Sequence, residues 1–407
     1  MSTTSESSSE GRTARSALAA LSLAMLMPSL GTSIANIGLP ALVASFAVSF
    51  REAQWVILAY LLAMTAVILG AGRLGDAVGR RRLLLAGIAL FTAASALCAA
   101  SPTLELLILA RAVQGVGAAV MTALSIAMVG DVVPERRTGS AIGLLGSMSA
   151  AGTTLGPAAG GLLIARFGWP AIFLINVPLG VVGFVLALRV LPNDPARRAA
   201  GPIRAPVVRP GLLRDRTLCA ALAANGLVAT VIMATLVVGP FYLASAYGLG
   251  PAAVGAAMAA GPLVAALAGA PAGRLVDRFG ADGSIGVALL GMAAGLTALA
   301  AAVSSVAGYV AAVALVTAGY ALFQAANGAK IMRRASPGER GTVSGMLNLS
   351  RNLGLMAGTS AMGGLYVRAG MSITFAAAAI LVGLAFAICA GDDAALKASR
   401  RAAAAES

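Results

Sequence analysis

Residues 217–273 read TLCAALAANGLVATVIMATLVVGPFYLASAYGLGPAAVGAAMAAGPLVAALAGAPAG, a run of 57 residues without one charged side chain. A helix of about 20 residues crosses the roughly 30 Å of hydrocarbon in a bilayer. This run therefore holds two membrane spans, with a turn near Tyr247–Pro251. Residues 283–329 are uncharged over 47 positions and hold two more spans, which turn near Ser304–Gly308. Both runs place the chain among polytopic α-helical membrane proteins.

The composition of the whole chain excludes a water-soluble globule. Only 11% of its 407 residues are charged and 59% are hydrophobic, whereas a soluble domain carries roughly 25% charged residues. The chain contains no histidine, which excludes imidazole as a catalytic base, proton relay or metal ligand. Three cysteines lie far apart in apolar runs, a spacing that fits neither a disulfide framework nor a zinc site: Cys98, Cys219 and Cys389. We expect no metal and no cofactor.

The remaining charge-free stretches predict one span each. The region after residue 340 divides into span 11, which contains Arg351, and span 12, which is uncharged. The single spans lie in residues 16–50, 53–72, 83–104, 112–130, 138–165 and 167–188, and then at about 342–366 and 371–391. We predict an all-α membrane protein with twelve transmembrane helices.

The positions of the basic residues predict the orientation in the membrane. An even number of spans puts both termini on one side, and 24 of the 29 Lys and Arg residues fall in the tails and loops of that side. Cytoplasmic loops carry the Lys and Arg excess, so both termini are predicted to be cytoplasmic, in a plasma membrane. Trp55 and Trp169 fall at the opposite interface, where indole rings settle. The net charge of +14 therefore reflects orientation and not a nucleic-acid partner.

An internal repeat divides the chain into two halves. The segment Gly72–Gly79 after span 2 is echoed 201 residues later by Gly273–Gly280 after span 8. Glycines of span 5 recur in span 11 at an offset of 202, namely Gly152 and Gly156 as Gly354 and Gly358. Span n resembles span n+6 in the same orientation, a transporter layout that places the substrate between the halves near the membrane centre. The predicted organisation is a disordered cytoplasmic tail 1–15, a six-helix bundle 16–190, a cytoplasmic linker 191–216, a second six-helix bundle 217–391 and a cytoplasmic tail 392–407.

An ordered set of motifs resembles signatures of the major facilitator superfamily, and the resemblance covers residues 15–391. Segments Gln54–Leu62 and Phe173–Pro178 are similar to the drug:proton antiporter branch of that family, which usually has 14 spans, so this chain resembles a 12-span relative. The other motif residues are Gly72, Asp76, Gly79, Arg80 and Arg81 in loop 2–3; Asp277 and Gly280 after span 8; Leu107, Arg111, Gln114 and Gly115 in span 4; and Gly152, Gly156, Pro157 and Gly160 in span 5, the motif associated with antiporters.

The resemblance implies a cytoplasmic gate built on two aspartates. Asp76 would dock on the N-terminus of span 11 at Gly341–Ser344, and Asp277 on that of span 5 at Thr138–Ser140. A carboxylate at a helix N-terminus is stabilised by roughly 0.3–1 kcal/mol when exposed and up to about 2 kcal/mol when partly buried. Both contacts would close the cytoplasmic side and break when it opens. The arginines after Asp76 also fit a role in orientation alone.

Two arginines lie inside predicted spans. An arginine at the membrane centre costs about 2.5–3.5 kcal/mol on insertion scales, so such residues face a cavity or a partner. For Arg111, about two turns inside span 4, snorkelling to the outer surface is the alternative. The resemblance gives Arg111 and Gln114 a role in proton and substrate coupling. Arg351, nearer the centre of span 11, would meet an anionic substrate group, backbone carbonyls or a polar side chain.

The glycines of span 5 predict a close helix contact. Gly152, Gly156 and Gly160 share one helix face, which lets another backbone approach closely, and Pro157 bends the helix locally. Such a contact seals against leaks, as an antiporter needs, although packing without a mechanistic role gives the same pattern.

Span 1 departs from the antiporter pattern. Gly31 stands where that branch usually has an aspartate ahead of Asn36 and the Leu39–Pro40 pair. All fifteen acidic residues lie in tails, loops or helix ends, which leaves acids such as Glu52 and Glu105 as proton carriers. The missing acid favours an uncoupled facilitator as the alternative function.

The substrate cavity is expected between spans 1, 4, 7 and 10, with contributions from spans 2, 5, 8 and 11. Because the chain is mostly Ala, Gly, Leu and Val, the cavity should be apolar with few polar anchors, which suits lipophilic compounds better than sugars. For each aromatic candidate, helix packing or a lipid-facing position is the alternative. The candidates are Asn36, Tyr60, Gln114, Phe241, Tyr242, Gln324, Asn327, Asn348 and Arg351.

The leading hypothesis is multidrug-type efflux of amphipathic or lipophilic small molecules by alternating access, with protons as the coupling ion and a monomer as the working unit. A uniporter or facilitator is the alternative. The lack of histidine, of a buried acid and of a nucleophile–base pair argues against an enzyme. A receptor-like or chaperone role without transport lacks the long soluble domain that would support it. No Gly-Lys-Ser/Thr loop occurs, so ATP is not the direct energy source.

Overall fold

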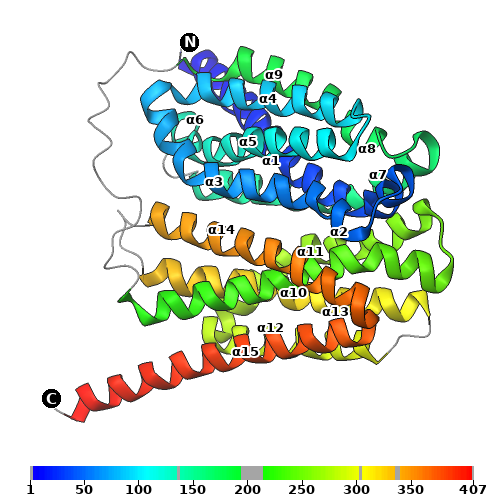
Figure 1. The fold of residues 1–407 in the computed structure, drawn as a ribbon. Coiled ribbons are helices and arrows are strands. Elements are labelled where there is room, and N and C mark those ends of the chain that lie inside the picture. Colours follow the sequence, from blue (N-terminus) through cyan, green and yellow to red (C-terminus); the bar gives the residue numbers. More distant parts are fainter. Residues whose placement is uncertain (1–2, 135–137, 194–213, 302–304, 335–339, 406–407) are drawn as a thin grey trace. The chain divides into compact units, whose positions relative to one another are not determined.

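The computed structural model describes residues 3–134, 138–193, 214–301, 305–334 and 340–405, and throughout these ranges every regular element is a helix (Figure 1). This confirms the predicted all-α class. The elements are α1 (Thr3–Phe46), α2 (Phe50–Ala53), α3 (Trp55–Val78), α4 (Arg80–Ala99), α5 (Leu104–Ala127), α6 (Val129–Val132), α7 (Thr138–Phe167), α8 (Ala171–Leu174), α9 (Asn176–Val190), α10 (Arg216–Tyr247), α11 (Pro251–Phe279), α12 (Ala281–Ala300), α13 (Val306–Arg334), α14 (Arg340–Ala357), the π-helical turn η3 (Gly358–Met362) and α15 (Gly363–Ala405).

The described helices account for twelve membrane crossings. Ten stretches of the described chain are long and apolar enough to span a bilayer. The last of them, Gly345–Ala394, runs for 50 residues and is broken into two helices at Gly370, where φ is 74° and ψ is −175°. The 30-residue helix α7 adds the twelfth, since a helix rises 1.5 Å per residue. The predicted fold of twelve helices is confirmed.

The chain divides into two compact units. Unit 1 comprises Met1–Arg204 and Gly250–Ala259, and unit 2 comprises Ala205–Leu249 and Ala260–Ser407. In unit 1, α1 packs on α7 and α9, and α4 packs on α5 and α9. In unit 2, α10 packs on α14 and α15, and α12 packs on α13 and α15. These are the same pairings moved six spans along the chain. Most of the predicted linker, residues 194–213, lies outside the described residues.

The tight turns repeat with the same offset. Gly79 between α3 and α4 has φ 111°, and Gly280 between α11 and α12 has φ 78°. Gly168 after α7 has φ 78°, and Gly370 before the last span has φ 74°. Glycine adopts positive φ without the steric cost that other residues incur. Each pair is 201 or 202 residues apart, so the sequence repeat is also a repeat of backbone geometry.

The chain ends differ from the prediction. The backbone is helical from Thr3, within the segment 1–15 that was expected to be a disordered tail, and α15 continues to Ala405. Residues 1–2 and 406–407 lie outside the described part. A Ser- and Glu-rich composition disfavours a helix on its own, but extending an existing helix adds a hydrogen bond for each residue fixed. The apolar span next to the tail therefore provides the helix nucleus that the tail sequence lacks.

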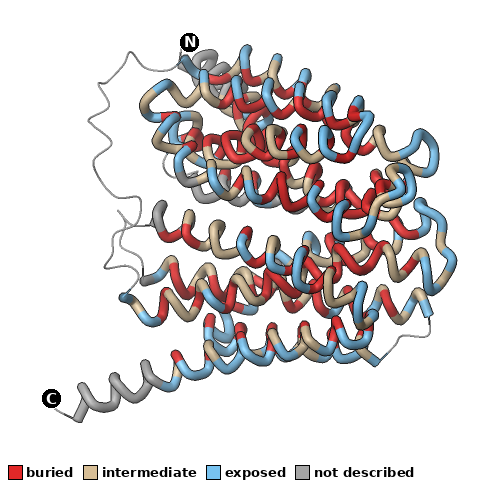
Figure 2. The backbone as a smooth tube through the Cα atoms, in the orientation of Figure 1, coloured by how far each residue is buried: buried red, intermediate tan, exposed pale blue. Residues whose placement is uncertain are grey.

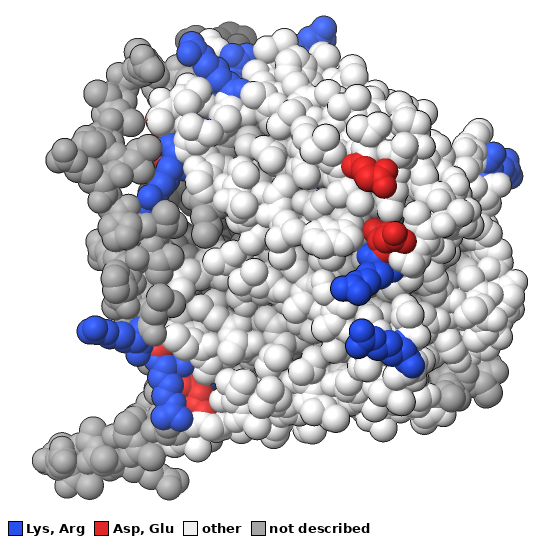
Figure 3. Space-filling model, in the orientation of Figure 1, with Lys and Arg blue, Asp and Glu red and all other residues white. Residues whose placement is uncertain are grey.

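Apolar side chains lie both between the helices and on their outer faces. Figure 2 shows buried positions along the inner sides of the helices of each unit. On the face shown in Figure 3, charged side chains are few and separated by wide uncharged areas, as a surface in contact with lipid tails requires. Large apolar residues that are more than half exposed mark the lipid-facing sides, among them Leu109, Val182, Leu267, Leu290 and Ile380.

Candidate functional site

Arg111 of α5 lies inside unit 1 with no exposed surface. Its Nε donates a hydrogen bond to the carbonyl oxygen of Val56 at 2.9 Å, and its Nη1 donates to that of Gly31 at 3.4 Å. Nη1 also donates to Oε1 of Gln114, three residues further along α5. Nη2 has no hydrogen-bond partner among the described residues. Two backbone carbonyls and one amide therefore surround this charge, and it does not snorkel to the surface.

Aromatic rings and hydroxyl groups complete the surroundings of Arg111. Its Cζ lies 4.2 Å from the ring centre of Tyr60 and 5.7 Å from that of Phe173, where the ring faces attract a cation. The hydroxyl of the fully buried Tyr60 donates to a carbonyl oxygen of α1 at 3.0 Å. Nε2 of Gln114 donates to Oγ of Ser95 at 2.6 Å. The network ties α5 to α1, α3, α4 and α8.

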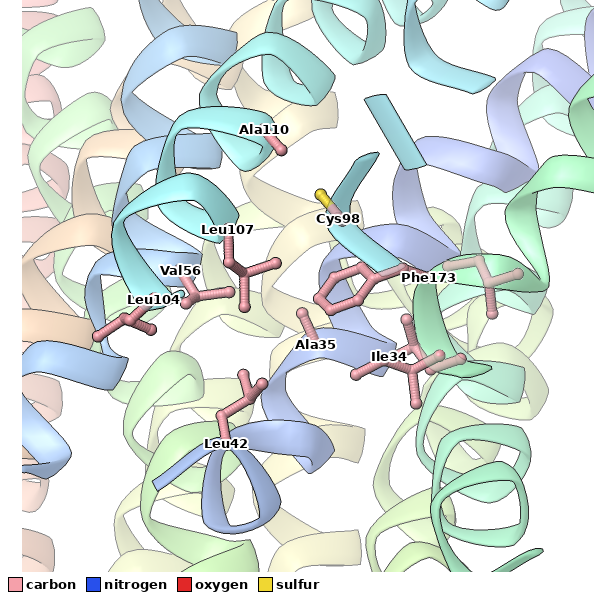
Figure 4. Close-up of a cluster of buried hydrophobic side chains, with 11 residues drawn as sticks. Ile34, Ala35, Leu42, Val56, Cys98, Leu104, Leu107, Ala110 and Phe173 are labelled. Carbon is pink, nitrogen blue, oxygen red and sulfur yellow. The ribbon is translucent and has the colours of Figure 1, made fainter. Parts of the chain in front are cut away.

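An apolar cluster lies beside this network. Figure 4 shows Phe173 next to Ile34 and Ala35 of α1, with Cys98 above it. Each of these four side chains is almost completely buried. A charge in apolar surroundings is costly unless it is paired or hydrogen-bonded, so the carbonyls that face Arg111 are what stabilise it in this position.

Gly31 lies directly against Arg111. Its carbonyl oxygen accepts the bond from Nη1, and a Cβ at Gly31 would lie only 3.2 Å from Cζ of Phe91. A side chain at this position of α1 would therefore start against Phe91 of α4, on the residue whose carbonyl binds Arg111. Within the described chain, no ion pair involves Arg111. Gly31, which replaces the expected acid of span 1, is thus also a residue whose carbonyl binds Arg111.

The glycine face of α7 packs against α1 with no room for side chains. A Cβ on Gly152 would collide with a backbone oxygen of α1, and one on Gly156 would collide with Oγ of Ser33 and lie 2.9 Å from the nitrogen of Ile34. A Cβ on Gly160 would lie 2.8 Å from Cγ1 of Ile34. Oγ of Ser33 donates to the carbonyl of Gly152 at 3.3 Å. The structure thus has the close approach that the sequence predicts.

Not every position of α7 is so constrained. Gly146 has open space where a Cβ would stand. Pro157 lies within the helix, which continues from Thr138 to Phe167. A Cβ on Gly161 would lie 2.5 Å from the carbonyl oxygen of Pro251 and 2.8 Å from Cα of Gly255, both on α11, so α7 requires glycine there too. Gly146 is a matched position on the same helix in open space.

The same contact recurs in unit 2. A Cβ on Gly354 would collide with the carbonyl oxygen of Gly226, and one on Gly358 with that of Thr230, both on α10. Oγ1 of Thr230 donates to the carbonyl of Gly354 at 3.0 Å, as the serine of α1 does in unit 1. Spans 5 and 11 therefore each form one tightly packed helix pair.

The loop 2–3 motif forms an ion-pair cluster around Arg80. Its Nε lies 2.8 Å from Oδ1 of Asp76, and its Nη1 lies 3.0 Å from Oδ2 of Asp131 at the end of α6. Nη1 also donates to the carbonyl oxygen of Ala127 at 3.2 Å. All three charged side chains are partly exposed, so each pair contributes about 0–1 kcal/mol. The cluster joins the ends of α3, α4, α5 and α6.

Arg81 and the motif glycines have separate roles. Nη1 of Arg81 donates to Oδ1 of Asn193 at 2.8 Å, and Nη2 donates to the carbonyl of Leu188 at 2.6 Å, which ties α4 to the end of α9. Gly79 makes the turn between α3 and α4. Gly72 has open space around it, so its lack of a side chain is not explained by packing in this conformation.

The predicted docking of the two gate aspartates stays a prediction. Asp76 belongs to unit 1 and its expected partner segment to unit 2. Side chains at Thr138–Ser140, and those of Gly341, Thr342 and Ser344, lie outside the described residues. Asp277 has no ion-pair partner among the described side chains, and Gly280 makes the turn that follows it.

The polar candidates of unit 2 lie on α13 and α14. Nδ2 of Asn327 donates to the carbonyl of Ala221 at 3.2 Å, and Nε2 of Gln324 donates to the hydroxyl of Tyr320 at 3.1 Å. Oδ1 of Asn327 and Nε of Arg351 are buried without a hydrogen-bond partner in the described chain. These two atoms are available to a bound molecule. Asn348 on α14 takes part in other interactions.

The remaining candidates pack within their own units. Tyr242 on α10 stacks on the fully buried Tyr309 with ring centres 6.0 Å apart, and the neighbouring Phe241 also has contacts. Nδ2 of Asn36 on α1 donates to the carbonyl of Thr32 at 3.3 Å, and its Oδ1 has no partner within the described ranges. Stacking on Tyr309 explains the position of Tyr242 without requiring a role in substrate binding.

Glu52, one of the two acids considered as proton carriers, is part of a helix cap. Its Oε2 accepts from the backbone nitrogen of Ser49 at 2.7 Å and from Oγ at 2.6 Å, while Oγ of Ser49 accepts from the nitrogen of Glu52. This reciprocal pair is a capping box. Glu105 lies exposed in the first turn of α5, whose cap is Thr103.

Several residues of these networks give no signal in the sequence. Asp131 lies 51 residues after Arg80, and Asn193 lies 112 residues after Arg81. Neither belongs to a motif, and only the packing of helix ends brings them to the arginines. Ser33 and Thr230, which bond the glycine helices, are equally ordinary in sequence.

Comparison with known proteins identifies a related family. The sequence model of the Major Facilitator Superfamily matches residues 21–239 and 218–405. The riboflavin transporter RibZ of Clostridioides difficile (strain 630) is 39% identical over 171 residues, which cover 42% of this chain and 38% of that protein. The multidrug resistance protein Stp of Mycobacterium tuberculosis (strain CDC 1551 / Oshkosh) is 39% identical over 191 residues, covering 46% and 36%. The matches thus span less than half the length of these relatives.

A solved structure shares the fold over nearly the whole chain. The D-xylose-proton symporter superposes with a TM-score of 0.79 at 16% sequence identity, covering 92% of this chain and 96% of that one. At this identity the likeness concerns the fold alone.

Proposed function

Because the chain belongs to the major facilitator superfamily, we propose that this multi-pass membrane transporter exports amphipathic or lipophilic small molecules by alternating access coupled to the proton gradient. It is a transporter and not an enzyme. We further propose a plasma-membrane location, cytoplasmic termini and a monomeric working unit. Docking of Asp76 and Asp277 on helix N-termini would close the cytoplasmic side.

The observation that carries the proposal of export is the contact between α1 and α7. Three glycines of the antiporter motif meet α1 so closely that no Cβ fits without movement. A helix pair without gaps holds its position against its neighbours and leaves no path for ions between its members. An exporter that works against a gradient needs such a seal, because a leak would dissipate the gradient that drives it.

The interior supports lipophilic substrates. Arg111 already receives its contacts from protein carbonyls, an amide and two rings. Of the candidate cavity residues, three have a buried polar atom without a hydrogen-bond partner in the described chain: Asn36, Asn327 and Arg351. A largely apolar site with a small number of polar anchors binds amphipathic ligands. The relatives named for multidrug resistance and for riboflavin transport agree with substrates of this kind.

A facilitator is the second candidate, and one observation favours it. Gly31 occupies the position beside Arg111 where a carboxylate would be the natural proton carrier. A facilitator would move substrate only down its own gradient, without proton movement.

The test uses purified protein in proteoliposomes, with ethidium and riboflavin as fluorescent probes. Coupled export predicts that an imposed pH gradient drives accumulation of a probe, and that a protonophore abolishes it. Accumulation that never exceeds the outside concentration, with or without the pH gradient, would leave the facilitator. Gly156→Leu should lose transport, whereas Gly146→Leu, on the same helix but in open space, should keep it.

A further inference from the structure

Arg111 is a buried cation without a carboxylate partner. Among the described side chains two cations are buried, Arg111 with no exposed surface and Lys330 with 9%. Nζ of Lys330 lies 2.7 to 3.1 Å from carboxylate oxygens of Asp282, Asp392 and Asp393. No ion pair among the described side chains involves Arg111. Carbonyls and aromatic rings lower the cost of burying its charge, but they do not neutralise it.

The acidic residues described in unit 1 do not supply a counter-ion. Asp76 and Asp131 pair with Arg80 at the start of α4. Glu52 belongs to the capping box of α2, and Glu105 is exposed.

The acids of unit 1 whose side chains lie outside the described residues are remote along the chain. Glu10, the nearer of the two on α1, precedes Gly31 by 21 residues, or roughly 30 Å of helix. Glu135 and Asp194 follow Asp131 and Asn193, which bond to the start of α4. That start is 14 or 15 residues, or roughly 20 Å of helix, before the part of α4 that joins the Arg111 network.

Arg111 has unused donors for an ion. Its Nε and Nη1 donate to two backbone carbonyls and to Gln114, whereas Nη2 is buried without a partner in the described chain. A guanidinium carries only donors, so Nη2 needs an acceptor. An anion would satisfy Nη2 and neutralise the charge at once.

Asn176 at the start of α9 also lacks partners. It is fully buried, and neither its Nδ2 nor its Oδ1 has a hydrogen bond within the described chain. The backbone stays helical through Ile175, with φ −56° and ψ −30°, so Asn176 lies on the same helix face as Phe173, three residues earlier. The ring of Phe173 lies 5.7 Å from Cζ of Arg111, beside Ile34 of α1 (Figure 4).

Contacts between α9 and α4 place this amide at the depth of the arginine network. The start of α4 bonds to the end of α9, so the two helices are antiparallel. A Cβ on Gly180 of α9 would collide with Thr92 of α4. Asn176 is one turn before Gly180, and Ser95 is one turn after Thr92. Asn176 is therefore level with Ser95, which accepts the hydrogen bond from Gln114.

Contacts with α1 give the same depth. Three residues before the amide, Phe173 packs beside Ile34. Seven residues after it, a Cβ on Gly183 would lie 3.4 Å from Cδ2 of Leu23. The level of the amide on α1 falls between these two contacts, nearer the first, and so close to Gly31, whose carbonyl accepts from Nη1 of the arginine. Two independent helices thus bring the unsatisfied amide to the unsatisfied guanidinium.

We propose that Arg111 and Asn176 bind one small monovalent anion, of the size of chloride, inside unit 1. Nη2 and Nδ2 donate to the ion, which neutralises the buried guanidinium. Oδ1 of Asn176 accepts from a water molecule that accompanies the ion, since a halide has no donor. The complete burial of both side chains selects a compact ion over an organic acid. The site goes beyond the proposed function, because the binding depends neither on the direction of transport nor on proton coupling.

Thermal unfolding of purified protein in detergent tests the site without transport. A ligand that binds only the folded protein stabilises it by RT ln(1 + [L]/Kd). At constant ionic strength, replacing sodium gluconate by sodium chloride should raise the unfolding midpoint along a saturating curve, and bromide should act in the same way. Gluconate is too large for a buried site of this kind and serves as the blank.

Variants assign the halide effect to the site. Arg111→Met should abolish it, because it removes the charge. Asn176→Leu should raise the Kd for chloride about tenfold, since it removes a hydrogen bond to a charged group. Asn176→Asp should unfold at the same temperature in both salts, because its carboxylate replaces the ion. Asn327→Leu is the matched control and should keep the wild-type effect, since Asn327 is equally buried with an unsatisfied Oδ1 but lies in unit 2.

Two outcomes would overturn the proposal. Equal midpoints of the wild type in chloride and gluconate would leave water as the partner of Nη2. An equal halide effect in wild type and in the Asn176 variants would show that halides act elsewhere on the protein. If Arg111→Met does not fold, anomalous diffraction from crystals of the wild type in bromide decides: a bromide beside Nη2 supports the site, and bromide only at other positions overturns it.

Discussion

Replacing Gly156 with alanine adds one methyl group at the tightest point between α7 and α1. The new Cβ would overlap Oγ of Ser33, and it would lie 2.7 Å from Cβ of Ser33 and 2.9 Å from the backbone nitrogen of Ile34. The serine hydroxyl can rotate away, but the Ile34 backbone cannot. The two helices must therefore separate, and the hydrogen bond from Ser33 to the carbonyl of Gly152 would be strained.

The size of the effect follows from a comparison with Gly146→Ala. Both substitutions gain helix propensity, up to about 1 kcal/mol relative to glycine, and this gain cancels in the difference between the two variants. Overpacking in a tight interior costs about 1–3 kcal/mol. We therefore expect the free energy of unfolding of Gly156→Ala to lie about 1–3 kcal/mol below that of Gly146→Ala.

The assay is unfolding by denaturing detergent, followed by the fluorescence of Trp55 and Trp169, together with transport in proteoliposomes. Gly358→Ala, the equivalent position on span 11, should behave as Gly156→Ala does, because its Cβ would also collide with a backbone oxygen. Equal stability and transport in Gly156→Ala and Gly146→Ala would refute the reasoning, since the close helix contact would then not constrain the protein.

Three further predictions concern single sites. Arg111→Lys should lower the free energy of unfolding by about 1–3 kcal/mol, because an ammonium cannot reach both the Val56 and Gly31 carbonyls; an unchanged unfolding midpoint would contradict this. Gly31→Asp should raise the number of protons moved per substrate in proteoliposomes, since it places a carboxylate on the residue whose carbonyl binds Arg111, and Gly31→Asn should not; an equal proton-to-substrate ratio in the two variants would contradict a role of this position in proton coupling. Ser49→Ala should lower the free energy of unfolding by about 0.5–2 kcal/mol through loss of the cap, with unchanged proton flux; a loss of proton flux would show instead that Glu52 carries the proton.

The fold could be predicted from the sequence because few structures satisfy all backbone hydrogen bonds inside a lipid bilayer. Charge-free runs of sufficient length, such as residues 217–273, must form helices in a bilayer, and the sequence repeat that ends at Gly79 and Gly280 indicated the two halves, whose turns at these glycines also repeat. The helical start at Thr3 was missed, because local composition does not report the cooperative extension of a neighbouring helix.

The candidate site was predictable only in part. Arg111 could be identified because an arginine inside a membrane span is costly and therefore faces a cavity or a partner. Gln114 could be identified because it belongs to the same motif. That backbone carbonyls of α1 and α3 are its acceptors could not be deduced, since every residue has a carbonyl. The ion pairs of Lys330 with Asp282, Asp392 and Asp393 could not be predicted for a related reason. These residues lie at helix ends, where charges are common, and only three-dimensional packing brings them together.

The central claim is that substrate export and proton movement are one coupled process. The most direct test records both fluxes at once in proteoliposomes, with a fluorescent probe outside and a pH-sensitive dye inside. The account predicts that a probe gradient alone drives protons in the opposite direction at a fixed ratio. Probe flux without any proton signal in the wild type would contradict the account.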